Sequence, residues 1–330
     1  RYQIAGQETE EMRGAVMWRR RGVMAGLGAA AVGAAGWGLL RGPDSLGPDQ
    51  LAALHAVPLT PPDGPLATYH LGHSLVGRDM PAMLAQMAGH DHASQLGWGA
   101  SLAQHRKGEV PGFEVENAHP AYRDAAGALA SGAFGAVVVT EMVELRDAIR
   151  WHDSAEHLAH WARAARAGNP AVRLYLYETW HRLDDPEGWL ERIDRDLAGL
   201  WEAQVLAPAM AAPDVGVIRV IPGGQVMAAA ARAIEAGRVP GLTSREDLFA
   251  RLPDGSTDPI HFGDIGAWLM ACAHFAVIYH RNPAGLPHRL ARADGSPALP
   301  PPDAAARVLQ EVVWQTVTRY PATGLAATVG

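Results

Sequence analysis

The sequence predicts an α/β protein, organised as a three-layer α/β/α sandwich around a mostly parallel sheet of five strands. Five short predicted strands alternate with longer segments of helical periodicity, a pattern typical of parallel strands joined by crossover helices. Because such crossovers are right-handed, we expect helices on both faces of the sheet. The 330 residues, of which 48% are hydrophobic and 19% charged, are enough for one large core.

The first 41 residues are predicted to lie outside this domain. Met17 and three arginines precede the uncharged, Ala- and Gly-rich stretch 22–40, which is typical of an export signal or a signal anchor. The paired arginines resemble a twin-arginine signal, and a helix over 22–40 would extend about 28 Å, enough to cross a bilayer. We therefore expect an exported protein, either periplasmic or anchored in the inner membrane. Cleavage near Ala34, retention as an anchor, and a buried Ala-rich helix of a cytoplasmic protein remain open.

Residues 42–64 are rich in Pro, Gly and Asp, which is typical of a linker or of an arm that wraps around a domain. The α/β domain itself is therefore predicted to span residues 65–330.

Most of the strands are predicted from short apolar runs, whereas the second, at 93–96, contains Ser94 and Gln95. The first run stops at Gly72, and the run that ends at Thr140 contains three consecutive valines and is the clearest buried strand. The five strands are expected at 66–71, 93–96, 135–140, 172–177 and 215–221.

The helices are predicted from apolar periodicity and capping residues. The helix at 154–167 follows Asp153, a good N-cap, and is ended by Gly168, Asn169 and Pro170. The other helices are expected at 78–89, 119–131, 187–203, 224–236, 244–251, 263–280 and 302–318. Residues 103–118 are expected to be irregular.

Composition excludes several classes of ligand. The net charge is −7 and the domain has no long Lys/Arg run, which argues against nucleic acid as a partner. The one cysteine, Cys272, lies in an apolar run and is expected in the core. Two pairs of closely spaced histidines, His90 with His92 and His157 with His160, lack a third ligand, so no metal is expected. No cofactor is expected either.

Polar residues follow each predicted strand and should gather at one edge of the sheet, because the carboxyl ends of parallel strands meet there. Asp258 and His261 are placed at the same edge, on a loop before the helix at 263–280. The residues that follow the first four strands are Ser74, Trp98 with Gly99, Thr140 with Glu141, and Glu178 with Trp180.

This set contains the groups that acyl transfer requires. Ser74 would be the nucleophile, His261 the base that takes its proton, and Asp258 the acid that orients the base. The backbone N–H groups of Ser74 and Gly99, with the hydroxyl of Thr140, would hold the oxyanion. The alternative for Ser74 and for Asp258 is a helix N-cap.

Two blocks of the chain resemble the SGNH (GDSL-like) hydrolase superfamily, with this chain as a divergent member. Gly72-His73-Ser74-Leu75 is similar to its Gly-Asp-Ser-Leu block, and Asp258-Pro259-Ile260-His261 to its Asp-x-x-His block. The resemblance covers roughly residues 65–282. It implies a flavodoxin-like sheet, a serine nucleophile, a histidine base, an orienting aspartate and an oxyanion glycine, which Gly99 matches.

One block departs from the superfamily. Its third block supplies an asparagine to the oxyanion hole, whereas this chain has Thr140-Glu141-Met142 after the third strand. An ionised Glu141 side chain cannot donate a hydrogen bond. The hole would therefore depend on backbone N–H groups and on Thr140, or the site would be weakened.

The expected function is a serine esterase that cleaves O-acetyl or other short-acyl esters of a small molecule or a carbohydrate. The predicted substrate contacts are Trp98, Glu141, Glu178 and Trp180. The alternative for Trp98 and Trp180 is packing under a loop, and the alternative for Glu141 is a structural ion pair. A carbohydrate O-acetyltransferase, or a non-catalytic envelope binding module on the same fold, are the alternative functions.

Overall fold

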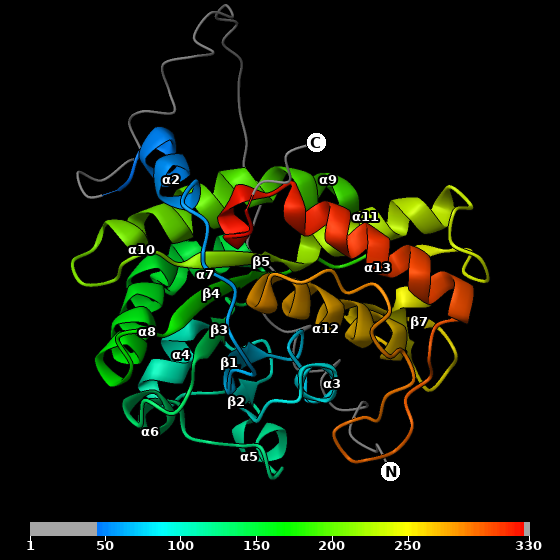
Figure 1. Ribbon diagram of the computed structural model, residues 1–330, viewed down its shortest axis with the longest axis horizontal. Coiled ribbons are helices and arrows are strands. Elements are labelled where there is room, and N and C mark those ends of the chain that lie inside the picture. Colours follow the sequence, from blue (N-terminus) through cyan, green and yellow to red (C-terminus); the bar gives the residue numbers. More distant parts are fainter. Residues whose placement is uncertain (1–44, 327–330) are drawn as a thin grey trace, which may run out of the picture. The chain divides into compact units, whose positions relative to one another are not determined.

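The computed structural model describes residues 45–326, which form one compact unit (Figure 1). Its central sheet contains β1 (Thr68–His73), β2 (His92–Gly97), β3 (Ala136–Val139), β4 (Arg173–Glu178) and β5 (Arg219–Pro222). The strands lie in the order β2-β1-β3-β4-β5, and every neighbouring pair is parallel. The predicted five-stranded parallel sheet is therefore confirmed.

Alternating side chains of the strands feed two separate cores, one on each face of the sheet. In β3, Ala136 and Val138 pack into one core, and Val137 and Val139 into the other. The same alternation continues in β4 with its tyrosines and leucines. A strand that is buried on both faces reads as a continuous apolar run, which is why the valine-rich β3 was predictable.

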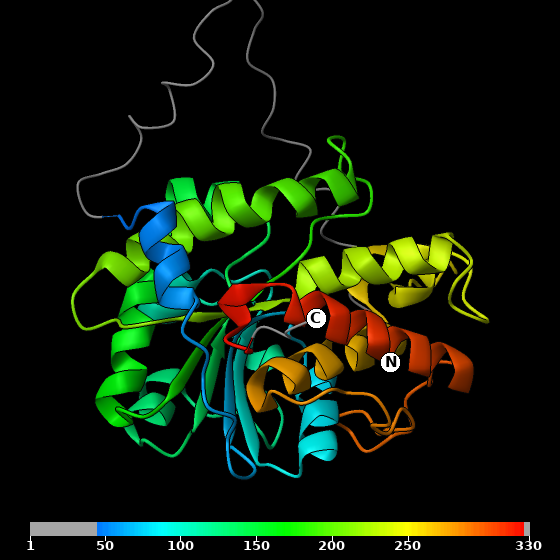
Figure 2. The same ribbon diagram turned by 45° about the horizontal axis from the view of Figure 1, so that its top comes forward.

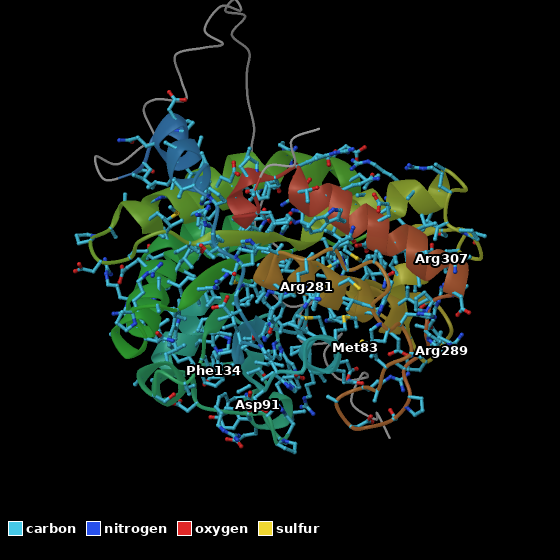
Figure 3. All side chains as sticks on the ribbon, viewed as in Figure 1. Met83, Asp91, Phe134, Arg281, Arg289 and Arg307 are labelled. Carbon is cyan, nitrogen blue, oxygen red and sulfur yellow. The ribbon has the colours of Figure 1, made fainter. Side chains whose placement is uncertain are left out.

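Helices cover both faces, which completes the three predicted layers (Figure 2). One face is covered by α3 (Asp79–Ala88), α11 (Gly223–Glu235), α12 (Asp264–Tyr279) and α13 (Asp303–Thr318). Met83 of α3, labelled in Figure 3, is fully buried in this layer, where α3 packs against α12. The other face is covered by α6 (Ala125–Ala130), α7 (Leu145–Trp151), α8 (Ser154–Gly168) and a long helical segment that ends at α10 (Ala207–Ala211).

The remaining elements are short or irregular. The long helical segment begins as α9 (Trp189–Asp196) and continues as a π-helix, η2 (Leu197–Leu206), into α10. The others are α2 (Pro48–His55), α4 (Leu102–Lys107), α5 (Phe113–Glu116), the 3₁₀ helices η3 (Arg245–Leu248) and η4 (Pro321–Thr323), and a hairpin of β6 (Phe249–Arg251) and β7 (Thr257–Phe262).

Several predicted boundaries are wrong. The helix expected at 119–131 is only α6, because Asp124 caps it at Gly127 N and the preceding residues bond along β2 through Ser94. The segment 103–118, expected to be irregular, contains α4 and α5. The helix expected at 244–251 is η3 followed by β6, and the loop expected to carry the Asp-x-x-His block is the strand β7.

Residues 45–64 include α2, whose Leu51 is buried in the core beside α10 and β5. The predicted export signal or anchor at 22–40 lies outside the described residues. Within residues 45–326, no helix combines the length and the apolar character that crossing a bilayer requires.

Candidate active site

Ser74 lies on the tight turn that follows β1. The N–H groups of Val76 and Gly77 donate to the carbonyl of His73, at 2.8 and 3.3 Å, and this closes the turn. Gly72 lies just before it, where a Cβ atom would lie 2.6 Å from Thr140 Cγ2. Only glycine fits this position, so β1 approaches the end of β3 closely and Ser74 is set at the carboxyl edge of the sheet.

Asp258 and His261 lie on one strand, β7, and are already arranged as a pair. The His261 Nδ1 atom lies 2.9 Å from Asp258 Oδ2. Asp258 Oδ1 accepts hydrogen bonds from the backbone N–H groups of Ile260 and His261, both at 2.9 Å. Burial alone would raise the pKa of Asp258, but these hydrogen bonds from His261 and Ile260 outweigh it and hold the pKa below its ordinary value.

The two segments meet at the serine. His261 Nε2 lies 2.9 Å from Ser74 Oγ, across 187 positions of the sequence. When His261 donates its Nδ1–H to the Asp258 carboxylate, its Nε2 lone pair faces the serine hydroxyl and can accept its proton. The His261 side chain is 45% exposed, so this hydrogen bond lies at the surface, where a substrate can approach.

The hairpin that carries Asp258 and His261 is attached to the segment after β4. Trp180 donates its indole N–H to Ile260 O at 2.8 Å, and Leu183 N donates to Pro259 O at 2.7 Å. The Trp180 ring packs on Phe262, with ring centroids 5.8 Å apart. These contacts fix β7 on both sides of His261.

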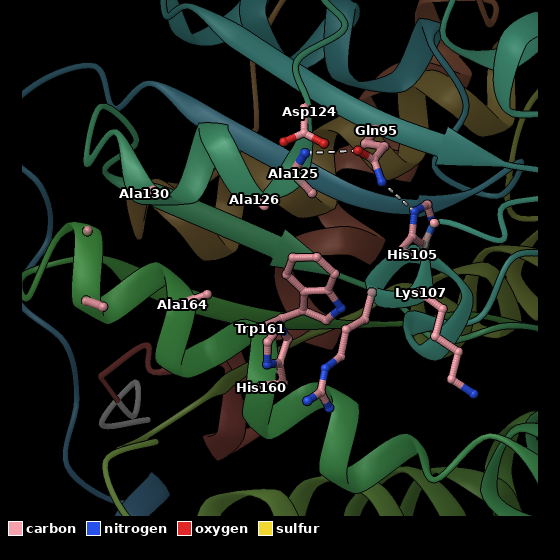
Figure 4. A pocket seen from close by; sticks show the side chains of 14 residues that line it. Gln95, His105, Lys107, Asp124, Ala125, Ala126, Ala130, His160, Trp161 and Ala164 are labelled. Carbon is pink, nitrogen blue, oxygen red and sulfur yellow. Dashed lines mark hydrogen bonds between the residues drawn. The ribbon is translucent and has the colours of Figure 1, made fainter.

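Two buried histidines support the turn that carries Ser74. His73 Nε2 donates to Glu141 O at 2.8 Å, and its Nδ1 accepts from Leu75 N at 3.3 Å. His105 Nε2 donates to Gly72 O at 2.9 Å, and its Nδ1 accepts from Gln95, as Figure 4 shows. Burial lowers the pKa of both rings to about 4, so both are neutral and keep these donor and acceptor roles.

Of the three predicted oxyanion donors, the N–H groups of Ser74 and Gly99 remain available and the Thr140 hydroxyl does not. His73 and Gly97 are register partners in the sheet, so the loop that carries Gly99 runs beside Ser74. Within the described chain, the N–H groups of Ser74 and Gly99 donate to no protein group. The prediction for Thr140 is wrong, because this residue is fully buried and its hydroxyl donates to Tyr177 O at 2.7 Å.

Trp98 remains available for substrate contact. Its side chain is 46% exposed on the same loop as Gly99. The ring lies against Gly112, where any Cβ would overlap it, and its N–H donates to Glu116 Oε1 at 2.8 Å. Arg78 bonds the carbonyls of Val115 and Glu116 and therefore fixes the same segment, rather than pairing with an acid.

Three predicted substrate contacts are wrong, because Glu141, Glu178 and Trp180 are fully buried. Glu141 accepts from Leu102 N and Met142 N, and burial raises its pKa to about 7. Trp180 supports β7, which was the packing alternative for this residue. Sequence reasoning placed these residues correctly at the ends of strands but could not show that other elements cover them.

Glu178 lies under the first turn of α11. It accepts from Gln225 N at 3.2 Å, and burial raises its pKa to about 8. A Cβ atom at Gly223 would overlap the Tyr177 ring, and one at Gly224 would overlap the Glu178 carboxylate. These glycines therefore let α11 approach β4.

One group of side chains has the composition of a metal site. Glu144, His181 and Asp185 place their ligand atoms within 4.8 Å of one another. The buried Arg192 bonds both carboxylates, at 2.8 and 2.9 Å, and already compensates their charge. A cation there would have to displace the guanidinium group, so these residues do not fit a metal.

The cavity in Figure 4 is separate from Ser74, Asp258 and His261. It has a volume of about 620 Å³ and lies between α4, α6 and α8, with His105 and Trp161 in its wall. Its lining contains neither Ser74 nor His261. Trp161 donates to Leu102 O at 3.1 Å, so this wall supports α4.

His73 and His105 are the supporting residues that sequence reasoning missed. His73 was predicted only as one residue of the Gly72-His73-Ser74-Leu75 block, and His105 lay in a segment expected to be irregular. No sequence signal marked either residue, because the first strand was predicted to end at residue 71; the structure shows that both imidazoles are buried, where each ring nitrogen needs a partner.

Comparisons with known proteins identify similar folds. Searches of family models and of curated proteins find no match to the chain. A crystal structure of a DUF4886 family protein from Bacteroides uniformis matches with a TM-score of 0.50 and 16% identity, over 78% of this chain and 96% of that one. This similarity is one of fold.

Two further solved structures match over about two thirds of this chain. One, described as a candidate SGNH hydrolase from Slackia heliotrinireducens, has a TM-score of 0.37 and 23% identity, over 64% of this chain and 97% of that one. The other, described as a candidate GDSL-like lipase from Parabacteroides merdae, has a TM-score of 0.39 and 12% identity, over 65% and 96%. In this chain the strands lie in the flavodoxin-like order that the resemblance implies, and the Ser74 and His261 blocks meet at one edge of the sheet.

Proposed function

We propose that the protein is a serine esterase that acts through an acyl-enzyme on short-acyl esters. The observation that carries the proposal is the continuous chain of hydrogen bonds from Asp258 through His261 to Ser74, with 2.9 Å at each step. A helix N-cap would account for neither contact, because in both the side chain bonds another side chain.

In the proposed reaction, Ser74 Oγ attacks the ester carbonyl while its proton passes to His261 Nε2. Asp258 stabilises the resulting imidazolium, and the N–H groups of Ser74 and Gly99 donate to the oxyanion. The tetrahedral intermediate then collapses, the ester C–O bond breaks, and His261 gives its proton to the departing alcohol. His261 then takes a proton from water, which attacks the acyl-enzyme; the bond between the acyl carbon and Ser74 Oγ breaks, His261 returns the proton to Ser74 Oγ, and the carboxylic acid leaves.

The nature of the substrate is the finer part of the proposal. Trp98 offers a half-exposed indole beside the nucleophile, which suits the flat apolar face of a sugar ring. We therefore favour O-acetyl or other short-acyl esters of carbohydrates. If the acyl group passed to a sugar hydroxyl instead of water, the same residues would make an O-acetyltransferase.

The test is hydrolysis of p-nitrophenyl acetate and butyrate by the full chain. Ser74→Ala and His261→Gln should each lower kcat by about 10³-fold or more. Ser131→Ala, which alters an exposed serine outside the site, should leave kcat unchanged. Equal activity in wild type and Ser74→Ala would refute the proposal.

A fluorophosphonate reagent gives a second measure of the nucleophile. It should modify one residue, Ser74, as shown by mass analysis of peptides, and the His261→Gln variant should react slowly. A well-folded wild-type protein that neither hydrolyses the esters nor reacts with the reagent would favour the non-catalytic module. To separate hydrolase from transferase, acetate and acetylated acceptor should be measured together when a xylo-oligosaccharide is added.

A further inference from the structure

A second cavity lies at the opposite edge of the sheet, where the parallel strands begin. It has a volume of about 580 Å³, and the arm before β1 contributes Thr60 to its wall. Arg166 of α8, Arg173 at the start of β4 and Arg219 at the start of β5 all line it. Arginines from three elements therefore line one cavity.

The three arginines bond backbone carbonyls instead of carboxylates. Arg219 donates to the carbonyls of His55 and Val57, at 3.0 and 2.5 Å, and Arg173 donates to Thr60 O at 2.6 Å. Arg166 likewise donates to two carbonyls that precede β5. In the part of the chain that the structure describes, none of the three forms an ion pair.

Some of their donors have no acceptor. Arg219 is only 4% exposed, yet its buried Nε–H has no hydrogen-bond partner among residues 45–326. The buried Nη1 of Arg173 is likewise unpartnered there. Neither nitrogen is accessible from the cavity, but a buried cation without a counter-ion is costly, and an anion in the cavity would offset this charge.

Arg192 shows how this chain compensates a buried arginine elsewhere. Its side chain is 1% exposed and bonds the carboxylates of Glu144, Asp185 and Asp196 at 2.7–2.9 Å. Carbonyl groups, such as that of His55 at the end of α2, supply only partial negative charge. The positive charge of the arginines in the second cavity is therefore not compensated by carboxylates, whereas that of Arg192 is.

The surroundings of the cavity add little negative charge. His280, at the end of α12, is affected first by burial and then by the charges of Arg173 and Arg219, and its pKa falls to about 4, so it is neutral. The acid in the lining, Asp214, is exposed and pairs with none of the three arginines. An anion entering the cavity would meet three cations and one acid at the surface.

We propose that this cavity binds a phosphate group, either free phosphate or the phosphate of a small phosphorylated molecule, through Arg166, Arg173 and Arg219. Donors that arrive from three elements suit a tetrahedral anion, whose oxygens point in several directions, better than a planar carboxylate. The volume of the cavity exceeds that of a phosphate ion and leaves room for the rest of a small phosphorylated molecule. The site lies at the edge of the sheet opposite to Ser74, so it is independent of the proposed ester hydrolysis.

The test is calorimetric titration of the full chain with inorganic phosphate, and separately with glycerol 3-phosphate, at constant ionic strength. Saturable binding at one site is expected, and the tighter ligand identifies the source of the phosphate. Arg173→Gln should weaken binding at least about tenfold, a loss of about 1.4 kcal/mol. Asp214→Asn should strengthen it. Arg163→Gln, which alters an arginine on the same helix that bonds Pro213 O outside the lining, should leave it unchanged.

Absence of saturable binding of both ligands to the wild type would overturn the proposal, whatever the variants do. Equal binding by Arg173→Gln and wild type would overturn it as well. Ester hydrolysis should be unchanged in Arg173→Gln, which also shows that this variant folds. If Arg173→Gln does not fold, Arg166→Gln replaces it and should show the same loss of affinity.

Discussion

Trp180 donates its indole N–H to the carbonyl oxygen of Ile260, 2.8 Å away, and so joins the segment after β4 to the strand that carries His261. Ile260 immediately precedes His261, so a shift of this carbonyl would move the imidazole relative to Ser74. The buried tryptophan therefore acts on the proposed chemistry through position, without touching a substrate.

Replacing Trp180 by Phe keeps a ring against Phe262 but removes this hydrogen bond. We expect kcat for p-nitrophenyl acetate to fall by about tenfold or more, because small displacements of a catalytic group are costly. KM should change little. The matched control is Trp268→Phe, which loses a comparable indole bond, to Pro287 O, away from His261. Both variants should lose about 1–3 kcal/mol of unfolding free energy, and only Trp180→Phe should lose turnover.

Asp258→Asn should separate the orientation of His261 from its presence. The carboxylate accepts from His261 Nδ1 and from two backbone N–H groups, and an amide can present an N–H to the ring instead of an acceptor. We expect kcat to fall by about 10³–10⁴-fold. Steady-state kinetics measures this loss, with Asp254→Asn, on the neighbouring turn, as the control. A loss of less than tenfold would mean that Asp258 does not orient the base.

Gly72→Ala should destabilise the fold by about 1–3 kcal/mol, because its Cβ would lie 2.6 Å from Thr140 Cγ2. Thr140→Ser removes that methyl group and keeps the hydroxyl that donates to Tyr177 O. Combining the two substitutions should therefore recover part of the stability. Urea denaturation of the four proteins measures the coupling, and strictly additive losses would show that this contact is not the cause.

Glu178 should make stability depend on pH. Burial raises its pKa from 4.5 to about 8, so the folded state keeps a proton that the unfolded state releases above pH 4.5. Its contribution to stability is therefore lost as pH rises from about 4.5 to about 8, and changes no further above that. Glu178→Gln, which cannot ionise, should show a smaller fall in unfolding free energy between pH 5 and 8. Urea denaturation at several pH values measures this, and parallel curves for the two proteins would contradict it.

The sequence predicted Ser74, Asp258 and His261 because each belongs to a short block whose order and context are informative without tertiary contacts. Depth was not predictable in this way. Glu178 follows a strand and lies at the correct edge, but α11 begins directly over it, and only the contacts of Gly223 and Gly224 reveal this.

The hairpin was also beyond sequence reasoning. The strand β6 has only three residues, too few for an alternating pattern, and it begins in a segment whose apolar residues suit a helix. Its pairing of Phe249 with Phe262 joins positions that no local rule relates. This is why a helix was wrongly predicted at 244–251 and a loop was wrongly predicted around Asp258.

The hairpin has a consequence for how the proposed activity could be lost. Asp258 and His261 form their pair within β7, whereas the serine belongs to the sheet, and the anchors from Trp180 and Leu183 hold the two parts together. If the hydrogen bonds from Trp180 and Leu183 were lost, Asp258 and His261 would move away from Ser74 together, with their own hydrogen bond intact. Ser74 would then lose its proposed base, although Asp258 and His261 themselves would be unchanged. Substitutions at Trp180 or Leu183 would thus change the proposed activity while Ser74, Asp258 and His261 stay the same.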